Sequence, residues 1–258
     1  QKPVLTVKGL TALSDRGLPA LKGIDLEVRS QEIMGLAGVE GNGQTELVEA
    51  LTGLREAAEG TVTLDGEDIT RATPLERIRM GVAHIPEDRY KRGVILDFSV
   101  MENLIMGGQR DRFARNSVAL DFREASSFSN EMMRDYQIQA PGKDTHVMYL
   151  SGGNQQRVVV AREFSRSPRL VVAAQPTRGL DVGATEYIRR QLLERREKGT
   201  AVLLVSEDLE EIFELAVRVA VLFEGRLMGI VPTGEATLEQ IGLLMAGSSS
   251  PAPREASR

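Results

Sequence analysis

Residues 33–45 read Ile-Met-Gly-Leu-Ala-Gly-Val-Glu-Gly-Asn-Gly-Gln-Thr, a short apolar run that leads straight into a glycine-rich loop. The run at 33–37 is apolar on both faces, which is typical of a central strand in a parallel sheet. Beyond the loop, Leu47, Leu51 and Leu54 fall on one face of a helix. The sequence therefore predicts a strand, a glycine loop and a helix, in that order.

A glycine loop between a strand and a helix is a common site for phosphates, because backbone N–H groups wrap the anion and the helix dipole adds to the attraction. In the form GxxxxGK[ST], the Lys reaches the β and γ phosphates and the hydroxyl holds Mg²⁺. Thr45 supplies that hydroxyl here, but Gln44 stands in the place of the Lys. Glycines alone would indicate only a turn, whereas the flanking strand and helix favour phosphate binding. The candidate nucleotide-binding residues are Gly38, Gly41, Asn42, Gly43, Gln44, Thr45 and Glu46.

The rest of the chain repeats the alternation of strand and helix. The patterns predict a helix at 155–165, a strand at 170–174, a helix at 182–198, a strand at 201–205, a helix at 209–216 and a hairpin that turns at 224–225. That order is typical of βαβ units and a parallel sheet. Before the glycine loop, period-two runs near 4–7 and 24–28 predict antiparallel strands.

No strand pattern is visible between about 97 and 149, where apolar residues follow loosely helical spacings. We therefore expect one α/β domain over 1–247 with the fold of a P-loop NTPase. It would have a mostly parallel central sheet, an antiparallel β subdomain and an inserted helical subdomain at about 95–150. The polar, Pro-containing stretch 248–258 predicts a disordered tail.

Composition excludes several classes of protein. The 258 residues carry a formal net charge of −5, whereas a nucleic-acid surface usually shows a basic excess. The absence of Cys excludes disulfides, thiolate metal sites and Cys nucleophiles. No apolar run approaches the ~20 residues that span a bilayer.

A second glycine motif lies at residues 150–156, which read Leu-Ser-Gly-Gly-Asn-Gln-Gln. Ser151 is a good N-cap, and Gly152 and Gly153 would let a phosphate approach a helix N-terminus. The string resembles the LSGGQ signature of ATP-binding cassette (ABC) proteins, in the LSGGNQQ form found in importers of simple sugars and nucleosides. The resemblance covers residues 4 to about 246.

This resemblance places the other cassette motifs, and several depart from the family pattern. The Walker B strand should end in Asp-Glu-Pro-Thr, but Ala174 and Gln175 replace the two acids that hold Mg²⁺ and activate water. Glu207 stands where the family has the switch His, and Glu87 stands where it has the Gln of the Q-loop. Glu87 and Thr45 are the candidate Mg²⁺ contacts. The D-loop Asp is kept as Asp181.

The adenine position and the nucleotide site as a whole also differ from the family pattern. No aromatic ring lies near residues 15–16, where a cassette usually stacks adenine. Gln44, Ala174, Gln175 and Glu207 each remove a charge-assisted contact, worth about 1.5–3 kcal/mol apiece, so the chain's own nucleotide site is predicted to be degenerate. Gln175 and Glu207 remain at the catalytic positions of that site.

Cassettes of this family pair head to tail, so each nucleotide lies between the Walker residues of one and the signature of the other. The resemblance therefore implies that Ser151, Gly152, Gly153 and Asp181 complete a partner's ATPase site. The chain alone should have negligible activity. The alternatives are a structural or regulatory cassette that binds no nucleotide and only scaffolds, and a self-sufficient P-loop kinase or GTPase.

More narrowly, residues 38–53 and 173–184 look like the C-terminal, second cassette of bacterial nucleoside importers. A monosaccharide importer is the runner-up. The resemblance implies ATP or ADP with Mg²⁺ as cofactors, and a first cassette of the same chain, transmembrane permease subunits and, indirectly, a substrate-binding lipoprotein as partners. It implies a peripheral position on the cytoplasmic face of the bacterial inner membrane, with no nucleic-acid partner.

Two other features have structural interpretations. His84 lies in an apolar strand and is expected to be a hydrogen-bonded core histidine. The Arg pairs at 189–190 and 195–196 share a predicted helix with Glu186, Glu194 and Glu197, which indicates a solvated, salt-bridged face.

Overall fold

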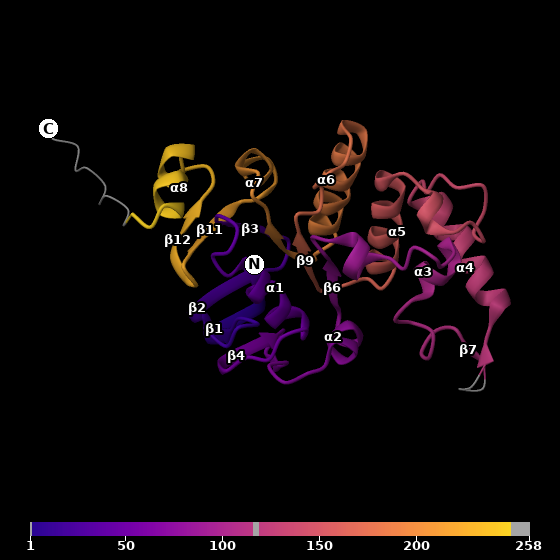
Figure 1. Cartoon of the computed structure of the whole chain (residues 1–258), viewed down its shortest axis with the longest axis horizontal. Helices are drawn as coiled ribbons and strands as arrows, with labels where there is room; N and C mark the ends of the chain where they lie inside the picture. Colours follow the sequence, from indigo (N-terminus) through magenta and orange to yellow (C-terminus); the bar gives the residue numbers. More distant parts are fainter. Residues whose placement is uncertain (1, 116–118, 249–258) are drawn as a thin grey trace, which may run out of the picture.

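The fold is built on a six-stranded sheet in the order β12-β11-β3-β10-β9-β6 (Figure 1). The computed structural model describes residues 2–115 and 119–248. The strands of this sheet are β3 (Ile33–Ala37), β6 (Val82–Ile85), β9 (Leu170–Ala174), β10 (Ala201–Val205), β11 (Arg218–Phe223) and β12 (Arg226–Pro232). Neighbouring strands are parallel except β11 and β12, which form an antiparallel hairpin. The mostly parallel sheet predicted from the sequence is confirmed.

The central strands are hidden on both faces, which explains their continuous apolar sequences. Every residue of β3, β9 and β10 is buried. Both faces of a central parallel strand are covered by other elements, so the side chains on both faces are apolar. The bounds of these strands are those that the sequence predicts.

A second sheet, in the order β2-β1-β4-β5, is antiparallel. Its strands are β1 (Pro3–Leu13), β2 (Pro19–Arg29), β4 (Glu59–Leu64) and β5 (Glu67–Asp68), with a turn at Asp65-Gly66 between the last two. Helix α1 (Gln44–Thr52) shares one apolar core with this sheet and one face of the central sheet. The helix that follows the glycine loop is thus held between two sheets.

The other face of the central sheet is covered by helices (Figure 1). These are α5 (Gly152–Phe164), α6 (Val182–Glu197), α7 (Leu209–Leu215) and α8 (Leu238–Met245). Helix α2 (Pro74–Met80) precedes β6 and begins with a capping box formed by Thr73 and Glu76. Among the described residues, no helix has the length and apolarity needed to cross a bilayer.

Between β6 and α5 the chain is mainly helical. It contains a π-helical turn at Arg89–Gly93, α3 (Val100–Ile105), α4 (Phe122–Asp135) and a 3₁₀ turn at Val147–Tyr149. The expectation of no strand here was wrong in one detail, because β7 (Ala114–Arg115) pairs with β8 (Ala119–Leu120). Two-residue strands are too short to show a period-two pattern. The predicted disordered tail lies, apart from Ser248, outside the described residues.

Candidate functional site

The glycine loop after β3 has the backbone conformation that a phosphate cradle needs. Gly41 and Gly43 have φ angles of 87° and 109°, a region that L side chains rarely adopt. A side chain at Gly43 would also approach the carbonyl oxygen of Ala20 to 3.0 Å. Asn42 ties the loop to the β11–β12 turn, because its Oδ1 accepts from the N–H of Glu224 (3.0 Å).

Gln44 does not extend away from the loop as a phosphate-seeking cation would. Its Nε2 donates to the carbonyl of Val39 (2.9 Å), and its Oε1 is buried with no hydrogen-bond partner. The amide lies over Gly38, where an added Cβ would come within 2.5 Å of Gln44 Nε2. The amide thus folds back over the loop that would bind the phosphates.

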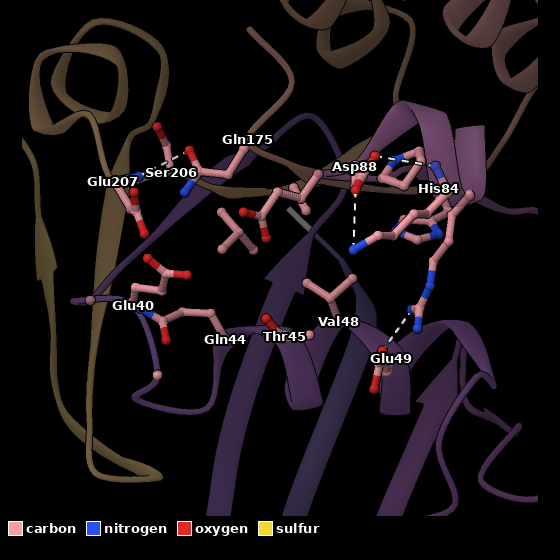
Figure 2. Close-up of a pocket in the computed structure, with 18 residues that line it drawn as sticks. Glu40, Gln44, Thr45, Val48, Glu49, His84, Asp88, Gln175, Ser206 and Glu207 are labelled. Atoms are coloured by element: carbon pink, nitrogen blue, oxygen red, sulfur yellow. Dashed lines mark hydrogen bonds and ion pairs between the residues drawn. The ribbon is translucent and has the colours of Figure 1, made fainter. Parts of the chain in front are cut away.

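A pocket opens above this loop, between α1, the end of β6 and the ends of β9 and β10 (Figure 2). Of the predicted nucleotide-binding residues, Gly38, Gly41, Gln44 and Thr45 line it, whereas Asn42, Gly43 and Glu46 do not. The predicted Mg²⁺ contact Glu87 and the predicted catalytic positions Gln175 and Glu207 also line it. The lining is Gly38, Glu40, Gly41, Gln44, Thr45, Val48, Glu49, His84, Pro86, Glu87, Asp88, Lys91, Arg92, Ala174, Gln175, Val205, Ser206 and Glu207.

The ionisable groups of the pocket are mostly acidic. Both of its strong bases are already paired, Arg92 with Glu49 at 2.6 Å and Lys91 with Asp88 at 3.6 Å. Within the described residues, Glu40 and Glu207 form no ion pair, and both are exposed. The pocket therefore offers a polyphosphate two unpaired carboxylates and no unpaired cation.

A metal ion also lacks a strong set of ligands here. In the part of the chain that the structure describes, no group of three or more His, Cys, Asp or Glu side chains could hold one. One carboxylate oxygen of Glu87 is bound by the guanidinium of Arg178. Thr45 and Glu87 line one pocket, but the acids of a magnesium site are replaced at the end of β9. The residues present therefore fit a magnesium nucleotide poorly.

Gln175, directly after β9, adopts a strained backbone conformation. Its φ angle is 46°, in the left-handed region, and its N–H donates to the carbonyl of Val205. Its Oε1 accepts from the N–H of Glu207 (3.3 Å). Such strain is concentrated at functional sites in proteins. The positions predicted as the Walker B end and the switch are thus joined by the side-chain amide of Gln175, which cannot act as a base toward water.

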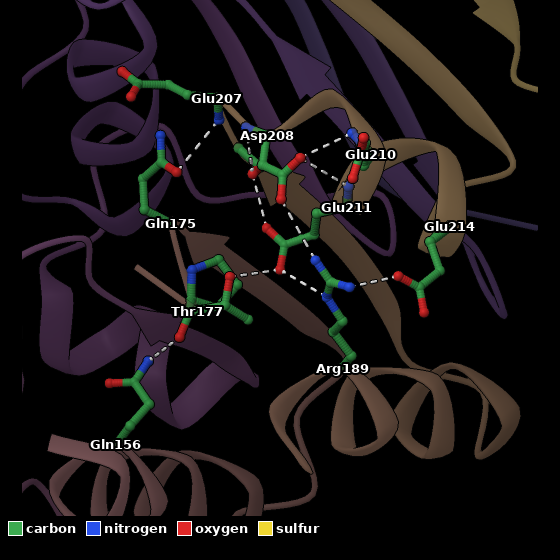
Figure 3. A network of polar contacts seen from close by, with 11 residues as sticks. Gln156, Gln175, Thr177, Arg189, Glu207, Asp208, Glu210, Glu211 and Glu214 are labelled. Carbon is green, nitrogen blue, oxygen red and sulfur yellow. Dashed lines mark hydrogen bonds and ion pairs between the residues drawn. The ribbon is translucent and has the colours of Figure 1, made fainter. Parts of the chain in front are cut away.

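A buried carboxylate connects the neighbouring loops (Figure 3). Glu211 is 1% exposed and accepts from the hydroxyls of Thr177 (2.7 Å) and Ser206 (2.8 Å). Arg189 of α6 approaches the same carboxylate at 3.5 Å and pairs with Glu214 at 2.6 Å. The expectation of a salt-bridged face within α6 was wrong for Arg189, since its partners come from α7 and the residue before it. Spacing along one helix cannot show a partner on another.

His84 also differs from expectation. Its ring Nε2 is buried without a hydrogen-bond partner, and the ring lines the pocket. Burial lowers the pKa of His84 to about 4, against the opposing effect of Glu163. The ring is therefore neutral at pH 7, as a core histidine would be, but it is not hydrogen-bonded at Nε2.

The expected adenine position, near the β1–β2 turn, holds polar groups. Arg55 pairs with Asp15 at 2.7 Å and with Glu49 at 2.6 Å. None of these three side chains has an aromatic ring on which a base could stack.

The signature residues lie outside the pocket, at the start of α5. Ser151 is exposed and caps the helix, because its Oγ accepts from the N–H of Asn154 (3.3 Å). Gly153 is buried against α6, where an added Cβ would meet that of Ala184 at 2.9 Å. Asp181 caps α6 through the N–H of Ala184 (2.9 Å). The structure thus brings Ser151, Gly152, Gly153 and Asp181 together, at two adjoining helix N-termini.

The signature helix is fixed to the loop after β9. Gln156 of α5 is buried, and its Nε2 donates to the carbonyl of Pro176 (2.7 Å). No role was predicted for Gln156, although it belongs to the signature string. The signature helix is therefore joined directly to the loop after β9, while the signature residues themselves do not line the pocket above the glycine loop.

Comparisons with known proteins agree with this arrangement. Residues 21–178 match the family model described as ABC transporter. Two solved ATP-binding cassettes of ABC transporters, one nucleotide-free and one in its ADP conformation, superpose with a TM-score of 0.76 each, at 22% and 20% identity. They cover 89% and 97% of this chain, and the chain covers 91% and 97% of theirs. At this identity the likeness concerns the fold alone.

Relatives found by sequence share more identical residues with this chain than these two structures do. The chain is 44% identical to the guanosine import ATP-binding protein NupO of Bacillus subtilis and 40% identical to the nucleoside import ATP-binding protein NupA of Lactococcus lactis. It is also 44% identical to the glucose import ATP-binding protein TsgD13 of Haloferax volcanii. Each match covers 95% of this chain but 48%, 49% and 45% of the relative. The chain thus spans about half the length of these relatives.

Proposed function

Because this chain belongs to the ABC transporter family, we propose that it is an ATP-binding cassette of a nucleoside importer, and the second of two cassettes in its protein. The names of two relatives, one for guanosine import and one for nucleoside import, support this cargo. Residues 1–247 form the nucleotide-binding domain of this proposal, with the helical subdomain at about 95–150.

In this proposal the chain's own nucleotide site is degenerate. Gln44 occupies the loop without adding a charge, and Glu40 and Glu207 repel the phosphates. Ala174 cannot hold Mg²⁺, and Gln175 cannot accept a proton from water. ATP or ADP with Mg²⁺ binds weakly or not at all on this side.

The working contribution is the signature. One observation carries this step: Ser151 stands exposed at the N-terminus of a 13-residue helix, outside the chain's own pocket. Such a terminus attracts phosphate. Ser151, Gly152, Gly153 and Asp181 complete the site of the first cassette, which supplies the Lys, the Glu and the His. Hydrolysis there drives import through transmembrane permease subunits that a substrate-binding lipoprotein feeds.

This function places the chain on the cytoplasmic face of the cell membrane, as a peripheral component bound to the permease. Nucleic acid has no part in it, which agrees with the net charge of −5. ATP and Mg²⁺ are the cofactors of the composite site.

Replacing Ser151 by Asp in the full-length protein, assembled with its permease, tests the composite site. Asp also caps helices, so Ser151→Asp keeps α5 while it adds a negative charge that faces the phosphate. We expect ATPase activity to fall at least about 100-fold, the scale of losing a preorganised contact to developing charge. The measurement is steady-state phosphate release.

The matched control is Thr237→Asp, at the exposed N-cap of α8. It makes the same kind of exchange far from the signature and should leave activity within about twofold. If Ser151→Asp also left activity unchanged, the chain would be a scaffold and not half of an ATPase site.

A sugar importer is the second candidate, because a relative named for glucose import matches at 44% identity. The two candidates differ in cargo and share the chemistry of the cassette. Uptake of labelled guanosine against labelled glucose by the complete system separates them.

A further inference from the structure

Arg89 lies beside the first residue of the signature helix, and nothing proposed above gives it a role. It opens the π-helical turn Arg89–Gly93, a conformation often found at functional sites. A Cβ added to Gly152 would meet Arg89 Nη2 at 2.8 Å and Cζ at 3.5 Å. The guanidinium therefore rests directly against the position where Gly152 leaves space.

The guanidinium is held in place by neutral groups. Its Nη1 donates to the carbonyl of Arg178 (3.2 Å), and its Nη2 donates to the hydroxyl of Tyr90 (3.2 Å). Its Cζ lies 4.8 Å from the centre of the Tyr90 ring. Arg178 is itself anchored through its ion pair with Glu87. The orientation of Arg89 is thus fixed before any ligand binds.

Its charge, however, has no partner. Over residues 2–115 and 119–248, Arg89 forms no ion pair, and its Nε is buried without a hydrogen-bond acceptor. A buried donor left unpaired is destabilising, and more so when the group is charged. Asp181, at the neighbouring N-terminus of α6, accepts from the N–H of Ala184 through Oδ1, and no ion pair joins it to Arg89 in the described part of the chain. No carboxylate of the described residues therefore neutralises the charge of Arg89, and an anion from outside the chain could do so.

The N-terminus of α5 increases the need for an anion beside Arg89. The N-terminus of α5 carries a partial positive charge, so a cation beside it is repelled and an anion is attracted. Arg89 and the α5 N-terminus together form a positive site that becomes favourable once an anion lies against both. The absence of a side chain at residue 152 is what lets the guanidinium approach this helix N-terminus so closely.

We infer that Arg89 donates to a phosphate of the nucleotide that the partner cassette holds, next to Gly152 and Ser151. This inference rests on the proposed function, because the nucleotide reaches the signature only in the composite site. A guanidinium presents several donors in a rigid fork and suits phosphate better than an ammonium. Arg89 would then add, from this chain, a positive charge against the phosphate undergoing transfer.

The test uses the full-length protein assembled with its permease. Arg89→Met keeps an unbranched apolar stem against Tyr90 and removes the charge; Arg89→Lys keeps the charge and loses the fork. Arg71→Met removes an exposed arginine far from the signature and serves as control. The readouts are kcat and KM for ATP, and the orthovanadate concentration that halves ATPase activity, since vanadate mimics the transferred phosphate.

For Arg89→Met we expect kcat/KM to fall about tenfold and the inhibitory vanadate concentration to rise by a similar factor. Arg89→Lys should be intermediate, and Arg71→Met unchanged. Unaltered kcat/KM, or a loss of activity with unaltered vanadate sensitivity, would overturn the inference. If Ser151→Asp abolishes activity while Arg89→Met is neutral, only this inference fails; if neither variant matters, the composite site itself fails.

Discussion

Purified alone, the chain is expected to hydrolyse ATP at least about 1000-fold more slowly than the assembled transporter. In the proposed degenerate site, four charge-assisted contacts of the family pattern are replaced, at Gln44, Ala174, Gln175 and Glu207. Even if only two of them contributed fully, at about 1.5–3 kcal/mol each, the barrier would rise by roughly 3–6 kcal/mol, which is at least about two powers of ten in rate. Loss of the partner's Walker residues adds to this. The measurement is phosphate release at saturating ATP.

Gln44→Lys alone is not expected to restore turnover. The new ammonium would meet a pocket that still has no Walker B acids and still carries the Glu207 carboxylate. Contacts that act together in catalysis are not additive, so one restored group recovers little.

The matched variant restores all four positions, as Gln44→Lys, Ala174→Asp, Gln175→Glu and Glu207→His. Two such chains paired head to tail would contain two complete sites, because the signature is already present. We expect measurable ATPase activity that rises with the square of protein concentration at low concentration. Turnover by the unaltered chain within tenfold of the transporter would contradict the degenerate site.

The second large effect concerns stability and involves Arg77, which is 2% exposed. Its guanidinium donates to the carbonyls of Ala50 and Leu51 at 2.7 Å each, and to those of Thr70 and Ala72 at 3.0 Å each. Ala50 and Leu51 lie in the last turn of α1, where carbonyls lack intrahelical partners. Arg77 thus closes the end of the helix that follows the glycine loop.

Arg77→Met is expected to lower the free energy of unfolding by about 3 kcal/mol or more. It leaves buried carbonyls without donors and removes a cation from the negative end of α1. Urea denaturation followed by circular dichroism gives the value, with the slope m checked for constancy.

Arg79→Met is the control two residues away. Arg79 is exposed and pairs with exposed Asp111 at 2.8 Å, so its loss should lower the free energy of unfolding much less than the loss of Arg77. Equal destabilisation by the two variants would show that Arg77 has no special role. Arg77→Lys, which keeps the charge but can reach fewer carbonyls, should lie between them.

Much of the fold follows from local sequence. The strands β3, β9 and β10 are uninterrupted apolar runs with both faces buried, and they have the predicted bounds. The N-caps at Thr73 and Ser151 are local hydrogen bonds between neighbouring residues. Such features depend on the nearest residues, so a single sequence carries them.

Other elements went undetected. Helix α8 was not predicted, although Thr237 and Gln240 form a capping box and Leu238, Ile241 and Leu244 mark an apolar face. That signal was present and lay just before the tail. For α5, the helix begins at Gly152, earlier than predicted, because two glycines at its start lower helix propensity while the Ser151 cap and packing on α6 stabilise it.

In the candidate site, too, some features follow from local sequence and others depend on long-range contacts. The sequence places the glycine loop and the signature by their motifs, but long-range contacts decide how side chains lie. Gln44 folds back on Val39, Glu211 is buried against Thr177, and Arg89 reaches Gly152 across 63 residues of chain. No pattern of spacing encodes these meetings, since they arise from packing between elements distant in sequence.

The most direct test asks which cassette holds the hydrolysed nucleotide. The full-length transporter is incubated with Mg²⁺, vanadate and a photoreactive azido-ATP, irradiated, digested, and the labelled peptides are identified by mass spectrometry. We expect one nucleotide trapped per pair of cassettes, with the label on the partner and not on residues 1–248 of this chain. Label attached at this chain's own glycine-loop pocket, in amounts equal to the partner's, would contradict the proposed division between signature and nucleotide site.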